Sequence, residues 1–530
     1  MAPQIDYFMS LNSPWTHLGA ARLEAMAARH GATIRVFPVD YGTIFKATGG
    51  LPLPQRSPQR QAYRMMELKR WRDHLGIPIR LEPRFFPMRE ALPAHCVIAL
   101  RETMGDAPAI RLARDGFPVY GRLERGYAAR REVMERYPGT RQAFLIDGKP
   151  MREGQILRQP DLARTLEAIA ERGFDGFYRG PVAKKLVAGV RAAGGQWTAE
   201  DLAAYRVKER EPLRFRYRDW EIVTAPPPSS GGVALAQMLN ILSAWDLRGL
   251  DPAARAHLTI EAMRRAYRDR TFYLGDPDFV HVPVDVLTSP YYAAGLRATI
   301  HPEKATPSDA LSGLPTPLED EETTHFSIID AEGNRAAVTQ TVNLLFGSGL
   351  VPPGTGVLLN NEMDDFALLP GQPNAFGVMG YEANAPQPGK RPLSSMTPTF
   401  MLSPDRIAVL GTPGGSRIIT MVLLGVLGYD DGLGAQEVAA LPRFHHQWWP
   451  DVVLAERGAF DAATAQRLRA MGHTLDLPED NVSGRASSHV WGNLQTVMWD
   501  LRSGTLQAGG DPRYRESSAQ VRQMEAAAAP

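Results

Sequence analysis

The 530-residue sequence predicts an α/β protein, and three observations support this class. At the start of the chain, an apolar strand segment, a helical segment and a second strand segment follow one another, which is the pattern of a β-α-β unit. Long segments with helical periodicity occupy the middle of the chain. In the second half, two threonine-rich segments with strand alternation are separated by a short turn segment, which is typical of a β-hairpin.

At the front of the chain, residues 5–9 and residues 32–39 are the predicted strands. The helix between them begins at Ser13, a residue type favoured at a helix N-cap, and Pro14 suits the first helical position. Four further helices are predicted, at residues 159–172, 180–193, 232–242 and 252–270. Residues 303–322 are rich in proline, serine and acidic residues without periodicity, so we expect an exposed, mobile segment there.

Composition excludes several classes of protein. A net charge of +1 leaves no basic excess to neutralise nucleic-acid phosphates. Cys96 is the single cysteine, which excludes an internal disulfide and a thiolate metal site. No apolar run has the length of a membrane span, and the first residues carry neither a basic leader nor an apolar signal core. We therefore expect a cytoplasmic protein without a cofactor or metal ion, and without nucleic acid or membrane as a partner.

The hairpin segments carry the first chemical signal. Thr323 and every second residue after it share one strand face, as do Thr341 and Asn343 on the second strand. Residues 331–334 form a turn-prone link, so an antiparallel pair would bring Thr341 and Asn343 towards Thr323. A threonine hydroxyl is a weak nucleophile unless a base lies beside it. Cutting the Glu322–Thr323 bond would create such a base, an α-amine with an ordinary pKa of about 7.7–8.0.

Three other features are candidates for a site with this threonine. Glu362 and Asp365 are three residues apart and could be an acid–base couple or metal ligands, although no histidine with ligand spacing accompanies them. Hydroxyls at positions 394 and 395 can donate to a carboxylate without adding charge. Gly414 and Gly415 lie between a strand (407–411) and a helix (416–427), where free backbone N–H groups suit an oxyanion.

These features belong to a series of motifs. The motifs are Leu112-Ala113-Arg114-Asp115-Gly116-Phe117, Pro226-Pro227-Pro228-Ser229-Ser230-Gly231-Gly232, Leu274-Gly275-Asp276-Pro277-Asp278-Phe279, Thr323-Thr324-His325, Thr339-Gln340-Thr341-Val342-Asn343, Asn360-Asn361-Glu362-Met363-Asp364-Asp365-Phe366, Lys390-Arg391-Pro392-Leu393-Ser394-Ser395-Met396 and Thr412-Pro413-Gly414-Gly415-Ser416-Arg417. Their order and spacing resemble the γ-glutamyltranspeptidase (glutathione hydrolase) family over roughly residues 109–520. The resemblance implies the four-layer αββα sandwich of N-terminal-nucleophile hydrolases.

The resemblance also implies a role for each site residue. Thr323 is the nucleophile released by cleavage at Glu322–Thr323, and Thr341 supports it. Gly414 and Gly415 bind the oxyanion, and Asn343 contacts the substrate. By the same resemblance, Glu362 and Asp365 bind the substrate α-amino group, and Ser394 and Ser395 bind its α-carboxylate. Residues 370–377 form a lid over the pocket, with Phe376 at its tip.

The front of the chain resembles a different family. Phe8-Met9-Ser10-Leu11-Asn12-Ser13-Pro14-Trp15-Thr16-His17-Leu18 is similar to the start of 2-hydroxychromene-2-carboxylate isomerases, thioredoxin-like relatives of kappa-class glutathione transferases. That resemblance implies a glutathione contact at Ser13 and ends near residues 107–110. The first segment of the transpeptidase family, with an arginine that holds the substrate carboxylate, is missing. Arg89 in Arg89-Glu90-Ala91-Leu92-Pro93 weakly echoes the motif around that arginine.

Three regions are therefore expected: a truncated thioredoxin-like β-α-β and helical segment (1–108), a large-subunit-like region (109–322) and a small-subunit-like region (323–530). The implied activity is γ-glutamyl transfer from glutathione and related compounds to amino acids or water, by a heterodimer of the two cleavage fragments. The lid disfavours a cephalosporin or glutaryl acylase, which is the nearest competing activity. The same residues are also compatible with a catalytically impaired fusion product or with a glutathione-dependent isomerase.

Overall fold

The computed structural model describes residues 108–311, 323–330, 333–369, 378–478, 491–514 and 517–521, and also residues 371, 372 and 374. In the front of the chain it describes residues 4–9, residues 32–38 and scattered positions between residues 22 and 74. Four of the predicted site residues lie outside the described residues: Ser13, Arg89, Glu322 and Phe376.

The chain divides into two units, one of residues 1–115 with 330–334 and one of the remaining residues. In the first unit, β1 (Gln4–Met9) pairs in parallel with β2 (Thr33–Pro38), and helical positions lie between them in the sequence. This agrees with the predicted β-α-β order, because parallel strands need a crossover connection. The unit also contains α5 (Pro108–Asp115).

The second unit is built on a six-stranded antiparallel sheet, in the order β17-β16-β12-β11-β8-β7. Its strands are β7 (Leu213–Tyr217), β8 (Trp220–Thr224), β11 (Thr399–Leu402), β12 (Arg406–Gly411), β16 (Gln495–Asp500) and β17 (Leu506–Gly510). Strands β7 and β8 precede the predicted cleavage site, and the other four follow it. The two predicted fragments therefore share one sheet, through the pairing of β8 with β11.

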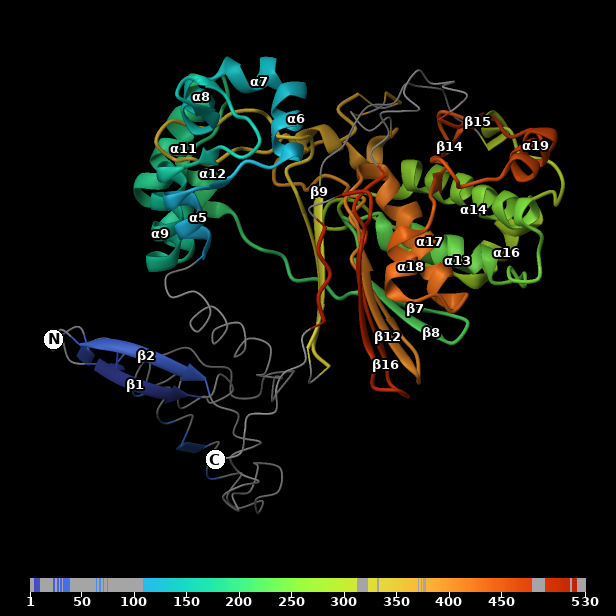
Figure 1. Cartoon of the computed structure of the whole chain (residues 1–530), viewed down its shortest axis with the longest axis horizontal. Helices are drawn as coiled ribbons and strands as arrows, with labels where there is room; N and C mark the ends of the chain where they lie inside the picture. Colours follow the sequence, from blue (N-terminus) through green and yellow to red (C-terminus); the bar gives the residue numbers. More distant parts are fainter. Residues whose placement is uncertain are drawn as a thin grey trace. The chain divides into compact units, whose positions relative to one another are not determined.

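Helices cover one face of this sheet (Figure 1). They are α13 (Gly231–Leu242), α14 (Pro252–Tyr273), α15 (Val284–Leu287), α16 (Pro290–Ala298), α17 (Ile418–Asp430), α18 (Ala435–Ala440) and α19 (Ala462–Ala470). Both α13 and α17 are apolar on nearly all sides and almost fully buried, as expected of helices at the centre of a core. Helix α14 begins where the Asp251 side chain accepts the N–H groups of Ala253 and Ala254.

The hairpin of β9 (Thr323–Ile329) and β10 (Arg335–Thr341) lies on the other face of the sheet, where β9 contacts β12 and β16 (Figure 1). Thr341 stands directly opposite Thr323, as the strand alternation predicts. On the outer face of the hairpin, the side chains of Phe326 and Ile328 are each 43% exposed. The described residues thus give two β layers and one helical layer of the predicted αββα sandwich.

A helical region precedes the sheet in sequence. Its helices are α6 (Gly121–Ala129), α7 (Arg131–Arg136), α8 (Pro138–Phe144), α9 (Pro160–Arg172), α10 (Phe174–Tyr178), α11 (Gly180–Ala192) and α12 (Ala199–Ala204). The loop after β10 inserts into the core of this region: Phe346 packs against Tyr127 and Phe144. Thr140 Oγ1 donates to the Gly349 carbonyl over 2.6 Å. This loop therefore fastens the hairpin to residues that precede the predicted cleavage site.

Short elements complete the second unit. They are the strand pairs β3 (Phe117–Pro118) with β6 (Ile156–Leu157) and β4 (Leu145–Ile146) with β5 (Lys149–Pro150), the three-stranded sheet of β13 (Phe444–His445), β14 (Val453–Ala455) and β15 (Leu475–Asp476), and the 3₁₀ helices η2 (Ser308–Leu311), η3 (Glu362–Asp365), η4 (Glu382–Asn384) and η5 (Gly415–Arg417). None of the helices in the described part of the chain combines the length and apolar character needed to cross a bilayer.

The four helices predicted in the middle of the sequence are confirmed as α9, α11, α13 and α14. The expectation of an exposed segment over residues 303–322 holds for five of the nine described positions (303–311), but it is wrong at Ala305 and Ser308, which are buried. The Ala305 N–H donates to the Met471 carbonyl over 2.7 Å, and Ser308 is fully buried in η2. Hydrogen bonds of Ser308 with Asp451 and Trp448 hold this segment, which composition alone does not reveal.

Candidate active site

Most of the predicted site residues line one small hollow in the second unit. The lining residues are Thr323, Thr341, Asn343, Glu362, Asp365, Ser394, Ser395, Met396, Gly415 and Ile418. They come from segments that are far apart in the sequence, and every polar residue among them was a sequence-based candidate. The apolar wall of Met396 and Ile418 was not predicted, because nothing in the sequence distinguishes these two residues from core residues.

The predicted nucleophile is hydrogen-bonded across the hairpin. Thr323 Oγ1 donates to Thr341 Oγ1 over 3.1 Å, and the Asn343 backbone N–H donates to the same Thr341 oxygen over 2.8 Å. Thr341 therefore holds the Thr323 hydroxyl in one orientation. Both threonines are partly buried in the hollow, so the hydroxyl of Thr323 is sheltered but accessible.

Asn343 follows β10 with a φ of 71°, a left-handed conformation that asparagine tolerates better than most residues. Its Nδ2 donates to the Asn361 carbonyl over 3.0 Å. Its Oδ1 is buried and has no hydrogen-bond partner among the described residues. A buried amide oxygen without a partner is unfavourable unless a donor group fills the site. Asn343 also lines the hollow, where its side chain is a candidate for contact with a ligand.

The two carboxylates lie on the 3₁₀ helix η3. The Glu362 N–H donates to Asn360 Oδ1 over 2.9 Å, and Asp365 Oδ1 accepts from Asn374 Nδ2 over 3.1 Å. Burial, and next the negative charge of Asp364, raise the pKa of Glu362 to about 7. A carboxyl with this pKa exchanges its proton near neutral pH and favours a cation beside it.

Ser394 and Ser395 are positioned by the motif that precedes α13. The Ser394 N–H donates to the Pro228 carbonyl over 2.9 Å, and the Ser230 N–H donates to the Ser394 carbonyl over 2.7 Å. Ser229 Oγ donates to the Met396 carbonyl over 2.6 Å. The sequence marks residues 226–232 as a motif, and the structure gives the reason. This segment forms the hydrogen bonds that hold the loop of residues 394–396, which we call the serine loop.

Gly414 lies in the turn after β12 and Gly415 begins η5, with φ angles of 135° and 45°. Both values favour glycine. A Cβ atom on Gly414 would approach the Met421 side chain to 2.5 Å, which is too close. Gly415 lines the hollow and Gly414 adjoins it in sequence. Backbone N–H groups in such a turn, ahead of α17, suit the predicted oxyanion site.

His325 fixes β9 against the sheet rather than lining the hollow. Its Nδ1 lies 2.7 Å from Thr339 Oγ1 and its Nε2 lies 3.0 Å from Ser327 Oγ. The ring covers Gly411, where a Cβ atom would approach the ring to 2.2 Å. Burial lowers the pKa of His325 to about 3, so the ring is neutral at physiological pH. The histidine of the Thr323-Thr324-His325 motif thus places the strand that carries the nucleophile.

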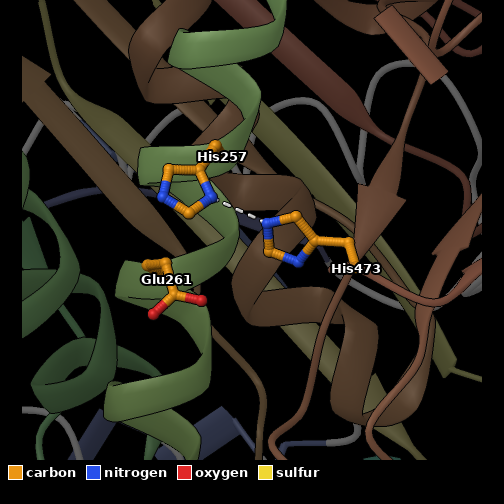
Figure 2. Close-up of side chains that lie close together, drawn as sticks. All are labelled: His257, Glu261 and His473. Carbon is orange, nitrogen blue, oxygen red and sulfur yellow. Dashed lines mark hydrogen bonds between the residues drawn. The ribbon is translucent and has the colours of Figure 1, made fainter. Parts of the chain in front are cut away.

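A separate buried cluster has the composition of a metal site. Potential ligand atoms of His257, Glu261 and His473 lie within 4.8 Å of one another (Figure 2). However, His257 Nε2 donates to the His301 carbonyl over 2.8 Å, so its Nδ1 must accept from His473 Nε2, also over 2.8 Å. Glu261 Oε2 accepts from Arg265 Nη1 over 2.5 Å. Both ring nitrogens of His257, Nε2 of His473 and the Glu261 carboxylate are thus engaged with protein partners, and the cluster joins α14 to the segment before β15.

The fold and the hollow define an N-terminal-nucleophile hydrolase. The family described as Gamma-glutamyltranspeptidase matches residues 91–521, and the DSBA-like thioredoxin domain matches residues 4–117. Because the first match covers most of the chain, the protein belongs to the γ-glutamyltranspeptidase family. The thioredoxin-like character of the front segment is confirmed as well, while its specific resemblance to isomerases stays a prediction.

Individual relatives agree with this assignment. The chain is 42% identical over 414 residues to the glutathione hydrolase proenzyme of Escherichia coli, a match that covers 77% of this chain and 69% of that protein. It is 44% identical over 378 residues to the glutathione hydrolase proenzyme of Pseudomonas sp. strain A14, covering 70% and 66%. The chain therefore spans about two thirds of the length of these relatives.

A solved structure shares the fold. The cephalosporin acylase from Bacillus halodurans superimposes with a TM-score of 0.67 at 28% identity, over 79% of this chain and 74% of the acylase chain. The fold assignment from the sequence is thus confirmed. The roles of the individual site residues, the domain limits and the cleavage site stay predictions.

Proposed function

We propose that the protein is a γ-glutamyl hydrolase and transferase that acts on glutathione and related γ-glutamyl compounds through Thr323, after cleavage of the Glu322–Thr323 bond. The observation that carries this proposal is the composition of the hollow. A hydroxyl nucleophile, two carboxylates and two serine hydroxyls line one small space. These groups match the amide, the ammonium and the carboxylate of a γ-glutamyl substrate.

In the proposed mechanism, cleavage gives Thr323 a free α-amine. The amine accepts the proton of the Thr323 hydroxyl as Oγ1 attacks the γ-amide carbonyl. Negative charge develops on the carbonyl oxygen, and backbone N–H groups at Gly414 and Gly415 stabilise it. The amine then returns the proton to the leaving nitrogen, the C–N bond breaks, and a γ-glutamyl ester on Thr323 remains. Water or an amino group attacks this ester and restores the threonine.

Substrate recognition follows from charge and hydrogen bonding. Glu362 and Asp365 receive the substrate ammonium, together with the unpartnered Oδ1 of Asn343. The hydroxyls of Ser394 and Ser395 donate to the α-carboxylate. Charge-assisted hydrogen bonds are the stronger ones, so this arrangement selects a zwitterionic head group over a neutral one.

The two fragments would stay together as a heterodimer after cleavage. Strand β8 of the first fragment is hydrogen-bonded to β11 of the second, with Thr224 opposite Thr399. Thr140 of the first fragment accepts the Val351 N–H of the second over 2.9 Å. Separating the fragments would break one continuous sheet and expose its core, which is strongly unfavourable.

The mass of the purified protein tests the proposal most directly. We expect two fragments, residues 1–322 and 323–530, and hydrolysis of γ-glutamyl-p-nitroanilide. Thr323→Ala should leave the chain whole and inactive, whereas Thr324→Ala, a matched change at the next residue, should still be cleaved. A wild-type chain that stays whole and yet hydrolyses the anilide would contradict the mechanism.

An acylase that hydrolyses glutaryl amides is the second candidate, favoured by the structural similarity to the cephalosporin acylase. A glutaryl group has the same carboxylate as a γ-glutamyl group but no ammonium. Glu362 and Asp365 would then have no substrate ammonium to bind, which favours the γ-glutamyl substrate. Comparing γ-glutamyl-p-nitroanilide with glutaryl-p-nitroanilide decides between the two, since a preference for glutaryl would show that the carboxylates are misassigned.

A further inference from the structure

Arg270 is a buried arginine directly behind the candidate carboxylate-binding serines. It lies in the last turns of α14 and its side chain is only 6% exposed. Its Nη2 donates to Ser395 Oγ over 3.1 Å, and its Nε donates to Ser230 Oγ over 2.9 Å. Ser230 Oγ in turn donates to the Ser394 carbonyl over 2.7 Å. The Arg270 guanidinium therefore contacts both the serine loop, at Ser395, and the segment that supports this loop, at Ser230.

The charge of Arg270 is only partly balanced within the protein. Arg265, another buried arginine of α14, pairs with the Glu261 carboxylate over 2.5 Å. The hydrogen-bond partners of Arg270 among the described residues are instead hydroxyl groups. Burial lowers the pKa of Arg270, and Tyr267 and Asp365 offset this effect only in part. A buried cation in such surroundings is costly, because burial removes its hydration and hydroxyl dipoles replace little of it.

The hydrogen-bond directions at Ser395 follow from the same contact. Because Ser395 Oγ accepts from the guanidinium, its own O–H proton remains available for donation. Ser395 lines the hollow and is partly exposed, so that proton can reach a bound ligand. A hydroxyl that accepts from a cation is a stronger donor, since linked hydrogen bonds polarise one another.

We propose that Arg270 supplies, through Ser395, the positive charge that the hollow uses to bind the substrate α-carboxylate. Arg270 is a positioning residue in this scheme: it orients the Ser395 hydroxyl and its charge is balanced when the carboxylate arrives. The inference rests on the proposed function.

The test compares two substrates that differ in the carboxylate. γ-Glutamyl-p-nitroanilide has it, and 4-aminobutyryl-p-nitroanilide lacks it but keeps the amine and the amide. For Arg270→Gln, we expect kcat/KM to fall on the order of ten- to a hundredfold with the γ-glutamyl substrate, mainly through KM. With the 4-aminobutyryl substrate we expect little change, because the missing charge has no carboxylate to bind.

Two variants keep the test decisive if Arg270→Gln folds poorly. Arg270→Lys retains the positive charge and should recover part of the selectivity for the γ-glutamyl substrate. Ser395→Ala removes the link between Arg270 and the hollow and should reproduce the selective loss. Arg265→Lys, the same change at another buried arginine of α14, is the matched control and should leave the ratio of the two substrates unchanged.

The outcomes separate this inference from the proposed function. A wild-type protein that fails to cleave itself and to hydrolyse γ-glutamyl-p-nitroanilide would overturn both. If the wild type is active and Arg270→Gln loses activity equally with both substrates, Arg270 has only a structural role and the inference alone is wrong.

Discussion

The binding of the substrate ammonium should depend on pH through Glu362. Burial, and next the charge of Asp364, raise the pKa of this carboxyl to about 7. Only the ionised form attracts an ammonium, so binding should be full above that pKa and weaken as pH falls below it. At pH 6 about one tenth of the carboxyl is ionised, and binding should therefore be about tenfold weaker than its plateau, or about 1.4 kcal/mol.

The inhibition constant of L-glutamate against γ-glutamyl-p-nitroanilide, measured between pH 6 and pH 8, is the assay. The Glu362→Gln variant has no group to titrate at this position, so the difference between the two profiles isolates Glu362 from the α-amine of Thr323. Asp364→Asn removes the second cause of the raised pKa and should move the midpoint to lower pH. Identical profiles for the wild type and Glu362→Gln would refute the reasoning.

Three more predictions follow from the same geometry. Asp365→Ala should weaken binding of γ-glutamyl compounds by about 1.5–3 kcal/mol with little change for glutaryl compounds, measured as inhibition constants of L-glutamate and glutarate. Thr341→Val keeps the shape but removes the acceptor of the Thr323 hydroxyl; kcat should fall by about twofold to tenfold at unchanged KM, and rates of hydrolysis check this. Folding stability should fall as pH drops from about 6.5 to about 4, because three buried histidines have lowered pKa values and only the unfolded chain binds their protons. These histidines are His325, His446 and His473. Denaturant unfolding at several pH values measures the effect, and stability that is flat or rises over this range would contradict it.

The sequence predicted the hairpin well because its signal is local. Strand alternation places Thr323 and His325 on one face, and the turn-prone residues 331–334 set an antiparallel register with Thr341 opposite Thr323. Side-chain period and turn chemistry are enough to define such a register. The residues that line the hollow were predicted differently, from the resemblance of their motifs to a known family. Local patterns could not predict that these residues lie together, because this depends on contacts between segments that are distant in the sequence.

Arg270 shows what motif resemblance could not provide. It is one of many arginines in a helical segment, and its partner Ser395 lies 125 residues further along the chain. Its distinctive property, a buried charge that faces hydroxyls, exists only once α14, the Ser230 loop and the serine loop are packed together. Ser308 illustrates the same limit, because the polar composition of its segment predicts exposure, while Ser308 is buried and hydrogen-bonded to Asp451 and Trp448.

The hairpin also explains how one residue could serve both in cleavage and in catalysis. Thr323 is held by its ladder position opposite Thr341 and by the hydrogen bond between their hydroxyls. The hydrogen bond between the hydroxyls does not involve the peptide bond to residue 322, so cutting that bond would release an amine without releasing the hydroxyl. The nucleophile would keep its orientation towards Gly415 and the serine loop through processing. Such preorganisation lowers the entropic part of the barrier for each later turnover.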